Sequence, residues 1–278
     1  MSYHNAIRGK KRAGGVAGKS GFNASKGGRK RRHPGTIPTA YWRVNGIAAD
    51  ATALPDVSKK GNGLNGTLGG TVDTSGADAS WNPTCPPGSF QSLRFNGSDN
   101  KVTIAYDADL KPSNTTKKLS ISMWIKTDQN NDYFLCAETD AASATAGWVY
   151  CAVGVGTGNK ANVYWNTAGG PNWRASSTSI NDDKWHHLVF VYNGSATNEI
   201  SSYVDGSLEV SNGAQSGNFV LANVPLLLGY RRHGGAVFYQ YFMDEIAYWT
   251  DIALTTDQVK DLYNLGRVPN SYAGIVKS

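Results

Sequence analysis

Short runs of alternating apolar and polar residues begin at Tyr41, and Gly, Asn, Asp and Ser separate them. In residues 118–127, KLSISMWIKT, every second residue from Leu119 to Ile125 is apolar, which is typical of a strand with one buried face. Residues 185–194, WHHLVFVYNG, and 200–211, ISSYVDGSLEVS, predict another pair of strands bounded by turns.

Two further patterns complete the fold prediction. Residues 92–106, SLRFNGSDNKVTIAY, predict a strand, an Asn-Gly type turn and a second strand. Residues 255–266, TTDQVKDLYNLG, predict a helix that Thr255 or Thr256 caps and Gly266 ends. The sequence therefore predicts an all-β sandwich with one short C-terminal helix and an irregular N-terminal arm.

Composition agrees with a turn-rich globular protein, since the 278 residues include 32 Gly and 8 Trp and only 17% are charged. We find no run of eighteen apolar residues and no apolar leader in the first thirty, so we expect neither a membrane helix nor a secretory signal. The three cysteines are expected to be reduced, with pairing of Cys136 and Cys151 as the alternative; Cys85 is the third.

Basic residues are concentrated in residues 1–40, which contain no Asp or Glu. The rest of the chain has 17 bases against 21 acids and is therefore net negative. A segment so rich in charge and Gly cannot bury enough apolar area to fold alone, so we expect it to require an acidic or structural partner. The bases of this arm are Arg8, Lys10, Lys11, Arg12, Lys19, Lys26, Arg29, Lys30, Arg31 and Arg32.

Five segments together resemble the laminin-G-like, concanavalin-A-like jelly-roll family, which includes the pentraxins. The resemblance implies two curved antiparallel sheets over about Tyr41 to Gly266. We therefore predict an arm at 1–40, a jelly-roll domain at 41–267 and a tail at 268–278. The segments are 56–68 (DVSKKGNGLNGTL), 93–104 (LRFNGSDNKVTI), 119–127 (LSISMWIKT), 185–209 (WHHLVFVYNG to SYVDGSLE) and 226–264 (LLLGYRRHGG to DLYN).

No pattern of catalytic residues is found. Some sugar-cleaving relatives use two carboxylates on one strand face, but Asp244 and Glu245 are adjacent and cannot share a face. His186 and His187 are also adjacent, so they point to opposite faces and cannot chelate one metal together. Residues 154–160, GVGTGNK, predict a hairpin turn, since no helix follows them as in a phosphate-binding loop. We predict that the protein is not an enzyme.

The stretch 226–235, LLLGYRRHGG, differs from the calcium-binding relatives that it resembles. Pentraxins place acidic and amide ligands after this strand, whereas guanidinium groups supply no oxygen ligand. We therefore expect no cofactor, with a weak calcium site at Asp244, Asp99 and Asn100 as the alternative. The same loop supplies donors for an anion, from Arg231, Arg232 and His233. Solvated hairpin residues are the competing interpretation.

Aromatic residues offer a second candidate surface. Residues 164–174, YWNTAGGPNWR, have the composition of a loop whose rings stack on sugars, with Trp165 and Trp173 as candidates together with Tyr230. The alternative is that both Trp side chains cap the edge of the sandwich.

Three functional hypotheses follow. The first is a non-enzymatic structural, decoration or adhesion protein of a virion, which the arm anchors to virion or scaffold proteins or to nucleic acid in an oligomeric assembly. The jelly-roll domain would then contact other subunits or glycans. The second is a secreted or surface carbohydrate-binding module, located outside the cell. The third is a polysaccharide hydrolase. No membrane partner is expected.

Overall fold

The structure is a computed structural model, in which residues 1–32 and 33–278 form two separate units. It describes residues 37–44, 51–58, 60, 63–69, 86, 89, 91–130, 133–138, 146–154, 158–167, 170–194, 198–213, 218–219, 222–231 and 237–266. Residues 1–36 of the arm, the C-terminal tail, Cys85, Arg232 and His233 lie outside these residues.

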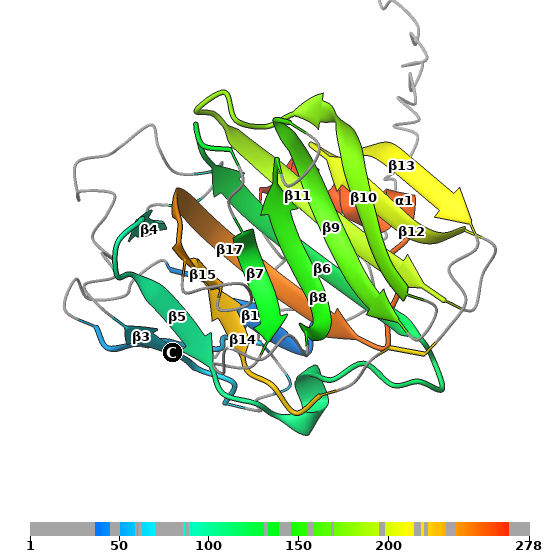
Figure 1. Cartoon of the computed structure of the whole chain (residues 1–278), viewed down its shortest axis with the longest axis horizontal. Coiled ribbons are helices and arrows are strands. Elements are labelled where there is room, and N and C mark those ends of the chain that lie inside the picture. The colour runs from blue at the N-terminus through cyan, green and yellow to red at the C-terminus, as the bar shows by residue number, and fades with distance from the viewer. Residues whose placement is uncertain are drawn as a thin grey trace, which may run out of the picture. The chain divides into compact units, whose positions relative to one another are not determined.

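Two antiparallel sheets contain most of the described strands (Figure 1). Sheet A has the order β1-β17-β6-β11-β12-β13, and β4 also pairs with β17. Its strands are β1 (Ala40–Trp42), β4 (Leu93–Asn96), β6 (Lys118–Lys126), β11 (Trp185–Asn193), β12 (Asn198–Val204), β13 (Ser207–Gly213) and β17 (Gln240–Thr250).

Sheet B has the order β10-β9-β8-β7-β14-β5-β3-β2. A separate short ribbon is formed by β15 (Tyr230–Arg231) and β16 (Val237–Phe238), which pair with each other. The strands of sheet B are β2 (Ala53–Leu54), β3 (Gly66–Gly69), β5 (Lys101–Ile104), β7 (Tyr133–Glu138), β8 (Ala146–Val153), β9 (Lys160–Thr167), β10 (Gly170–Ser179) and β14 (Leu226–Leu228).

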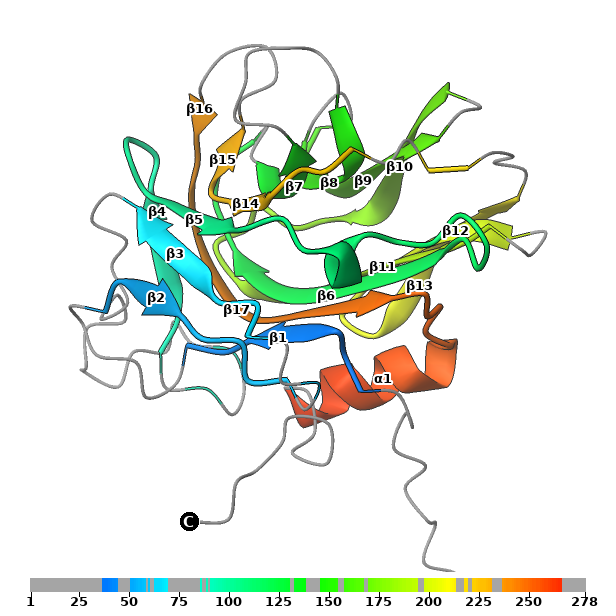
Figure 2. The ribbon, with the colours of Figure 1, turned by 90° about the horizontal axis from the view of Figure 1, so that it is seen from below.

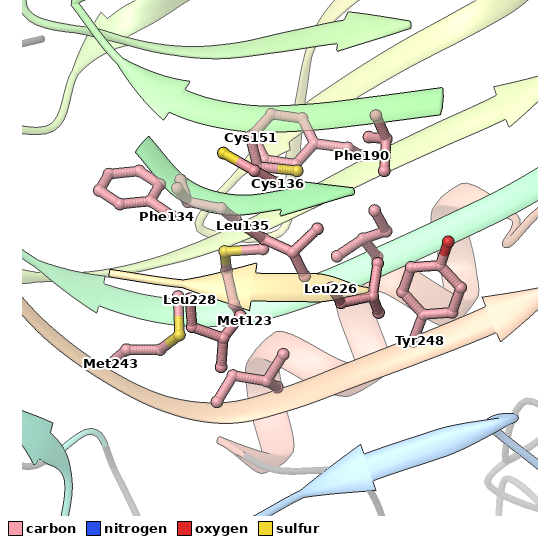
Figure 3. Packing of buried hydrophobic residues seen from close by; sticks show 14 of the residues in the cluster. Met123, Phe134, Leu135, Cys136, Cys151, Phe190, Leu226, Leu228, Met243 and Tyr248 are labelled. Atoms are coloured by element: carbon pink, nitrogen blue, oxygen red, sulfur yellow. The ribbon is translucent and has the colours of Figure 1, made fainter. Parts of the chain in front are cut away.

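The main core lies between the sheets, and helix α1 (Thr256–Leu265) lies on the far side of sheet A (Figure 2). Met123, Leu226 and Tyr248 project into this core from strands of both sheets (Figure 3). The predicted alternation in β6 is confirmed, because Leu119, Ile121, Met123 and Ile125 are all buried in this core. Cys136 and Cys151 are both buried and are not joined in a disulfide.

Both ends of α1 follow from local sequence. Thr255 is the N-cap: its side chain accepts from the backbone N–H of Gln258, whose side chain accepts from the N–H of Thr255. Gly266 ends the helix in the left-handed conformation. The helix buries Val259 and Leu262 in a second cluster on the outer face of sheet A. A short 3₁₀ helix, η1 (Ala108–Leu110), follows β5. The predicted helix and the sandwich are confirmed.

The two strands and the turn predicted at residues 92–106 are confirmed. The strands do not pair with each other: β4 pairs with β17 in sheet A, whereas β5 pairs with β14 and β3 in sheet B. The Asn-Gly turn therefore crosses from one sheet to the other. The Asn100 side chain accepts from the N–H of Asn96 at 2.9 Å, and the N–H of Gly97 donates to the carbonyl of Tyr239 at 3.0 Å.

The predicted loop at residues 164–174 is wrong. Its two ends belong to β9 and β10, which pair antiparallel with Tyr164 opposite Trp173. The predicted turn at residues 154–160 is confirmed, because β8 and β9 on either side of it also pair antiparallel.

The edge of sheet B at β10 is joined to the edge of sheet A at β13. Glu209 of β13 accepts from the backbone N–H groups of Ser177 and Thr178, each at 3.1 Å, and from both of their hydroxyls. These bonds occupy backbone donors that an edge strand would otherwise present to another chain. They also hold β10 in place.

A buried corner joins β14 to the β15–β16 ribbon at Gly229. The N–H of Gly229 donates to the Tyr241 hydroxyl at 2.8 Å, and this hydroxyl donates to the carbonyl of Phe134 in β7 at 2.9 Å. Gly229 has φ +72°, and a Cβ at this position would overlap the ring of Phe95. Only glycine combines this conformation with so close an approach of a ring.

We predict that Gly229→Ala lowers the free energy of unfolding by about 2–5 kcal/mol, because left-handed strain and overpacking add. Gly158→Ala is the matched control. Gly158 has φ +73°, but a Cβ there would meet no described heavy atom within 4 Å. This control should lose only about 1–2 kcal/mol. Urea unfolding measures both, and equal losses would show that the corner is not tightly packed.

Candidate functional site

Four aromatic side chains contact one another in series, from β9 and β10 to β7 and the residue that precedes β17. Two of them, Tyr133 and Tyr239, are 7% and 5% exposed and belong to the main core cluster. Tyr164 of β9 and Trp173 of β10 have ring centroids 4.7 Å apart. Trp173 meets Tyr133 of β7 edge-on at 6.4 Å, and Tyr133 lies 5.5 Å from Tyr239. Trp173 is 36% exposed. We call these four residues the aromatic surface.

Small residues beneath the rings make this contact possible. The strands of Tyr133 and Trp173 are separated by β8 and β9, so their backbones are about 14 Å apart. Ala152, Asn162 and Ala175 lie opposite Tyr133 in successive strands. Ala152 and Asn162 are fully buried. The two rings therefore lean toward each other over these positions.

Arg231 of β15 lies at the edge of the aromatic surface. Its guanidinium carbon is 4.7 Å from the centroid of the Tyr133 ring, within the range of a cation–π contact. The side chain is half-buried, and its Nε is buried without a hydrogen-bond partner in the described structure. Burial lowers the pKa of Arg231, but the phenols of Tyr239 and Tyr133 and the thiol of Cys136 together outweigh it and raise the pKa.

Two other predicted ligand contacts, Trp165 and Tyr230, are both buried. Trp165 alternates with Tyr164, points into the core between Tyr192 and Phe219, and has no exposed surface. A sugar ring therefore has no face of Trp165 to stack on. Tyr230 is 3% exposed and packs against Phe238. Arg232 and His233 lie outside the described residues.

The two adjacent acids occupy a β-bulge in β17. Residues 240–243 pair with β4 and residues 246–248 pair with β1, so Asp244 and Glu245 lie where the neighbouring strand changes. Their register against β6 shifts at the same place, and Glu245 has φ +52°. Donors from nearby segments occupy the gap. Asp244 accepts from the Ser89 hydroxyl and from the N–H of Val44 at 3.3 Å.

Both acids are engaged in structural contacts. The Tyr41 hydroxyl donates to Glu245, which also pairs with Nε of Arg43 at 3.1 Å. Asp244 is fully buried, and burial raises its pKa to about 6 although the hydrogen bond from Ser89 lowers it. A pair of carboxylates this enclosed has no access to a glycosidic bond, in contrast to the open arrangement that hydrolysis requires.

The three residues of the alternative calcium site are not brought together. Asp99 and Asn100 belong to the crossing turn, where both accept hydrogen bonds from Asn96. Asn96 pairs with Gln240, and four extended residues, about 13 Å, separate Gln240 from Asp244. Calcium ligands must lie within about 2.6 Å of the ion. Within the described residues, no group of three or more His, Cys, Asp or Glu is placed to hold a metal.

His186 and His187 point to opposite faces of sheet A, as alternation requires. His186 contacts Asp205 at 2.8 Å and Asp182 at 3.0 Å, and the hydrogen bond with Asp205 raises its pKa despite burial. The ring of His187 lies tilted against Trp124, and its Nε2 is 2.9 Å from the Ser122 hydroxyl. Burial lowers the pKa of His187 to about 4. This Ser–His pair is enclosed, so it has no access to a substrate.

Sequence reasoning did not select Tyr133 as a candidate. It begins β7 after a polar stretch of sequence, and nothing local indicates that its ring meets Trp173, forty residues later. Tyr164 and Tyr239 were recognisable only as aromatic residues near turns. Recognising that these rings meet requires the order of the strands in the sheet.

A family model described as the concanavalin A-like lectin/glucanases superfamily, laminin G type, matches residues 96–260, more than half of the chain. The chain belongs to this superfamily. The predicted resemblance is therefore confirmed, and the two-sheet sandwich is its jelly roll. No curated protein sequence matches the chain.

Solved structures of the same fold include domains of bacterial toxins. The binding domain of Paraclostridial Mosquitocidal Protein 1 is 13% identical, with a TM-score of 0.60 over 82% of this chain and 52% of that one. A botulinum neurotoxin type C structure, described as dependent on two ganglioside molecules for cell entry, is 11% identical, with a TM-score of 0.58 over 83% of this chain and 51% of that one. This jelly roll spans about half the length of these toxin domains.

Domain 4 of AbnA, a GH43 extracellular arabinanase from Geobacillus stearothermophilus, matches over nearly its whole length. This domain was solved in complex with arabinotriose. It is 18% identical, with a TM-score of 0.55 over 82% of this chain and 98% of that one. At these identities the similarity establishes the shared fold. Within the described residues, no helix has the length and apolar character to cross a membrane.

Proposed function

We propose that this protein is a non-catalytic glycan-binding subunit that its basic arm attaches to a larger assembly. The glycan-binding part of this proposal rests on Trp173, an exposed ring on sheet B that contacts Tyr164 and Tyr133. Flat aromatic side chains held in this way stack on the apolar faces of sugar rings. The arabinotriose complex of AbnA domain 4 supports this choice, because it has the same fold.

We propose that the protein is not catalytic because the adjacent acids Asp244 and Glu245 are not available to a substrate. Asp244 and Glu245 are enclosed by Ser89, Val44, Tyr41 and Arg43 at the bulge of β17. Their oxygens satisfy donors in the fold, and they lie on sheet A, whereas Trp173 lies on sheet B. A sugar stacked on Trp173 therefore meets neither carboxylate.

The charge of the arm suggests attachment of the subunit to a larger assembly. We propose that this assembly is a virion. Ten bases without an acid, ahead of a domain that is net negative, suit contacts with nucleic acid phosphates or with acidic protein surfaces. The jelly-roll domain is then displayed outward, where it meets glycans. A carbohydrate-binding module outside the cell is the alternative, and it needs no function for the arm.

We predict that Trp173→Ala weakens glycan binding at least about tenfold, because loss of one stacked ring costs about 1.4 kcal/mol. Tyr106→Ala is the control, since Tyr106 is 37% exposed outside the aromatic surface. The full-length variants would be compared on an oligosaccharide array, and the best binder then titrated by calorimetry. Equal affinity of parent and Trp173 variant would exclude the aromatic surface as the site.

We predict that replacing all ten arm bases with Gln abolishes incorporation into particles but leaves the melting temperature of the domain unchanged. Binding of the parent to DNA or to an acidic protein should fall steeply as salt rises, because each contact releases counterions. The control has the ten bases in shuffled positions and should retain binding. Normal incorporation of the Gln variant would contradict the anchoring role and favour the carbohydrate-binding module.

A further inference from the structure

Arg231 is a cation held against the aromatic surface without an opposing carboxylate. No acidic side chain among the described residues forms an ion pair with it, and the groups that raise its pKa are two phenols and a thiol. Arg43 and Lys126, by comparison, pair with Glu245 at 3.1 Å and Asp183 at 3.2 Å.

Contact with Tyr133 also restrains the orientation in which the Arg231 guanidinium can bind a ligand. Stacking on Tyr133 restrains the guanidinium, so little side-chain entropy is left to lose when a ligand binds. Its Nε is a buried donor without a hydrogen-bond partner among the described residues, as is the Nε of Arg174. Because Nε is buried, a ligand oxygen would meet the terminal nitrogens of this half-buried side chain.

The aromatic surface and Arg231 are contiguous through a single ring. Tyr133 contacts Trp173 on one side and the guanidinium of Arg231 on the other. Trp173 and Arg231 therefore lie on either side of the Tyr133 ring, within the span of a short oligosaccharide. A carboxylate or sulfate on that oligosaccharide accepts two parallel N–H bonds from a guanidinium group, which a neutral hydroxyl does not do.

We propose that the glycan recognised by this protein is anionic, and that Arg231 selects it by binding a sugar carboxylate or sulfate. This inference rests on the proposed glycan-binding function and adds the substrate class. Trp173 supplies the stacking, Tyr133 positions the guanidinium, and Arg231 supplies the discrimination between charged and neutral sugars.

The test uses full-length protein and matched pairs of ligands that differ only in charge. Trigalacturonate and its methyl ester form one pair, and a sulfated galactan oligosaccharide and its desulfated form are the other. At 150 mM salt we expect the parent to bind at least one anionic form about tenfold or more tightly than its neutral partner, the range of a charge-assisted bond. The pair that shows the preference identifies the anion as carboxylate or sulfate.

Arg231→Gln should remove this preference and leave the neutral form bound as before. Arg231→Lys, which retains charge without the planar fork, should retain only part of it. Arg94→Gln is the control, because Arg94 is exposed on β4 of sheet A and its loss changes the net charge equally. The arm is identical in all variants, so its own attraction for anions cancels in the comparison.

Two outcomes would overturn the proposal and are distinguishable. If the parent binds neutral and anionic forms equally, or the Arg231→Gln variant retains the full preference, Arg231 does not select the ligand, and glycan binding at Trp173 stands. If no oligosaccharide of either charge binds, the proposed function fails as well. Circular dichroism of each variant establishes that it is folded.

Discussion

The hydroxyl of Tyr241 is the interaction on which the candidate site depends. It accepts from Gly229 at the corner between β14 and β15 and donates to the carbonyl of Phe134 in β7, so one phenol joins three separate segments. The Tyr241 ring packs between Phe95 and Phe134, which exclude water from these bonds. Because β7 carries Tyr133 and β15 carries Arg231, the same phenol sets the distance between the aromatic surface and its cation.

Charged residues of the described domain have mainly structural duties. Glu209 joins the edges of the two sheets, and Asp244 and Glu245 satisfy donors where β17 changes its neighbour. A buried carboxylate is stabilised by such donors, and leaving one donor unpaired would be more costly than the bond itself is favourable. Arg231 differs from this pattern because it has no carboxylate partner among the described residues and contacts the Tyr133 ring beside the exposed Trp173. That difference is why we assign it a ligand.

The sequence predicted what depends on local periodicity and failed where strand order decides. Leu119 to Ile125 alternate, and Thr255 and Gly266 cap a helix, so β6 and α1 were predictable from neighbours in the chain. The Asn-Gly turn at 96–97 gave no sign that it crosses between sheets, because hairpins and crossings use similar turn residues.

Only part of the candidate site was predicted, because strand order brings its residues together. Trp173 and Arg231 were named, but Trp165 was named with them, since alternation assigns opposite faces without saying which one is buried. Tyr133 became recognisable only when β7, β8, β9 and β10 were placed side by side. The bulge at Glu245 likewise depends on the junction of β4 and β1, which lie far apart in sequence.

The most direct test of the account is a crystal structure of the full-length protein with the anionic oligosaccharide that binds most tightly. We predict one sugar ring stacked on Trp173 and the carboxylate or sulfate within about 3 Å of the Arg231 guanidinium, as in other charge-assisted hydrogen bonds. An oligosaccharide bound on another face of the sandwich, or bound at Trp173 with its anion directed away from Arg231, would contradict the account.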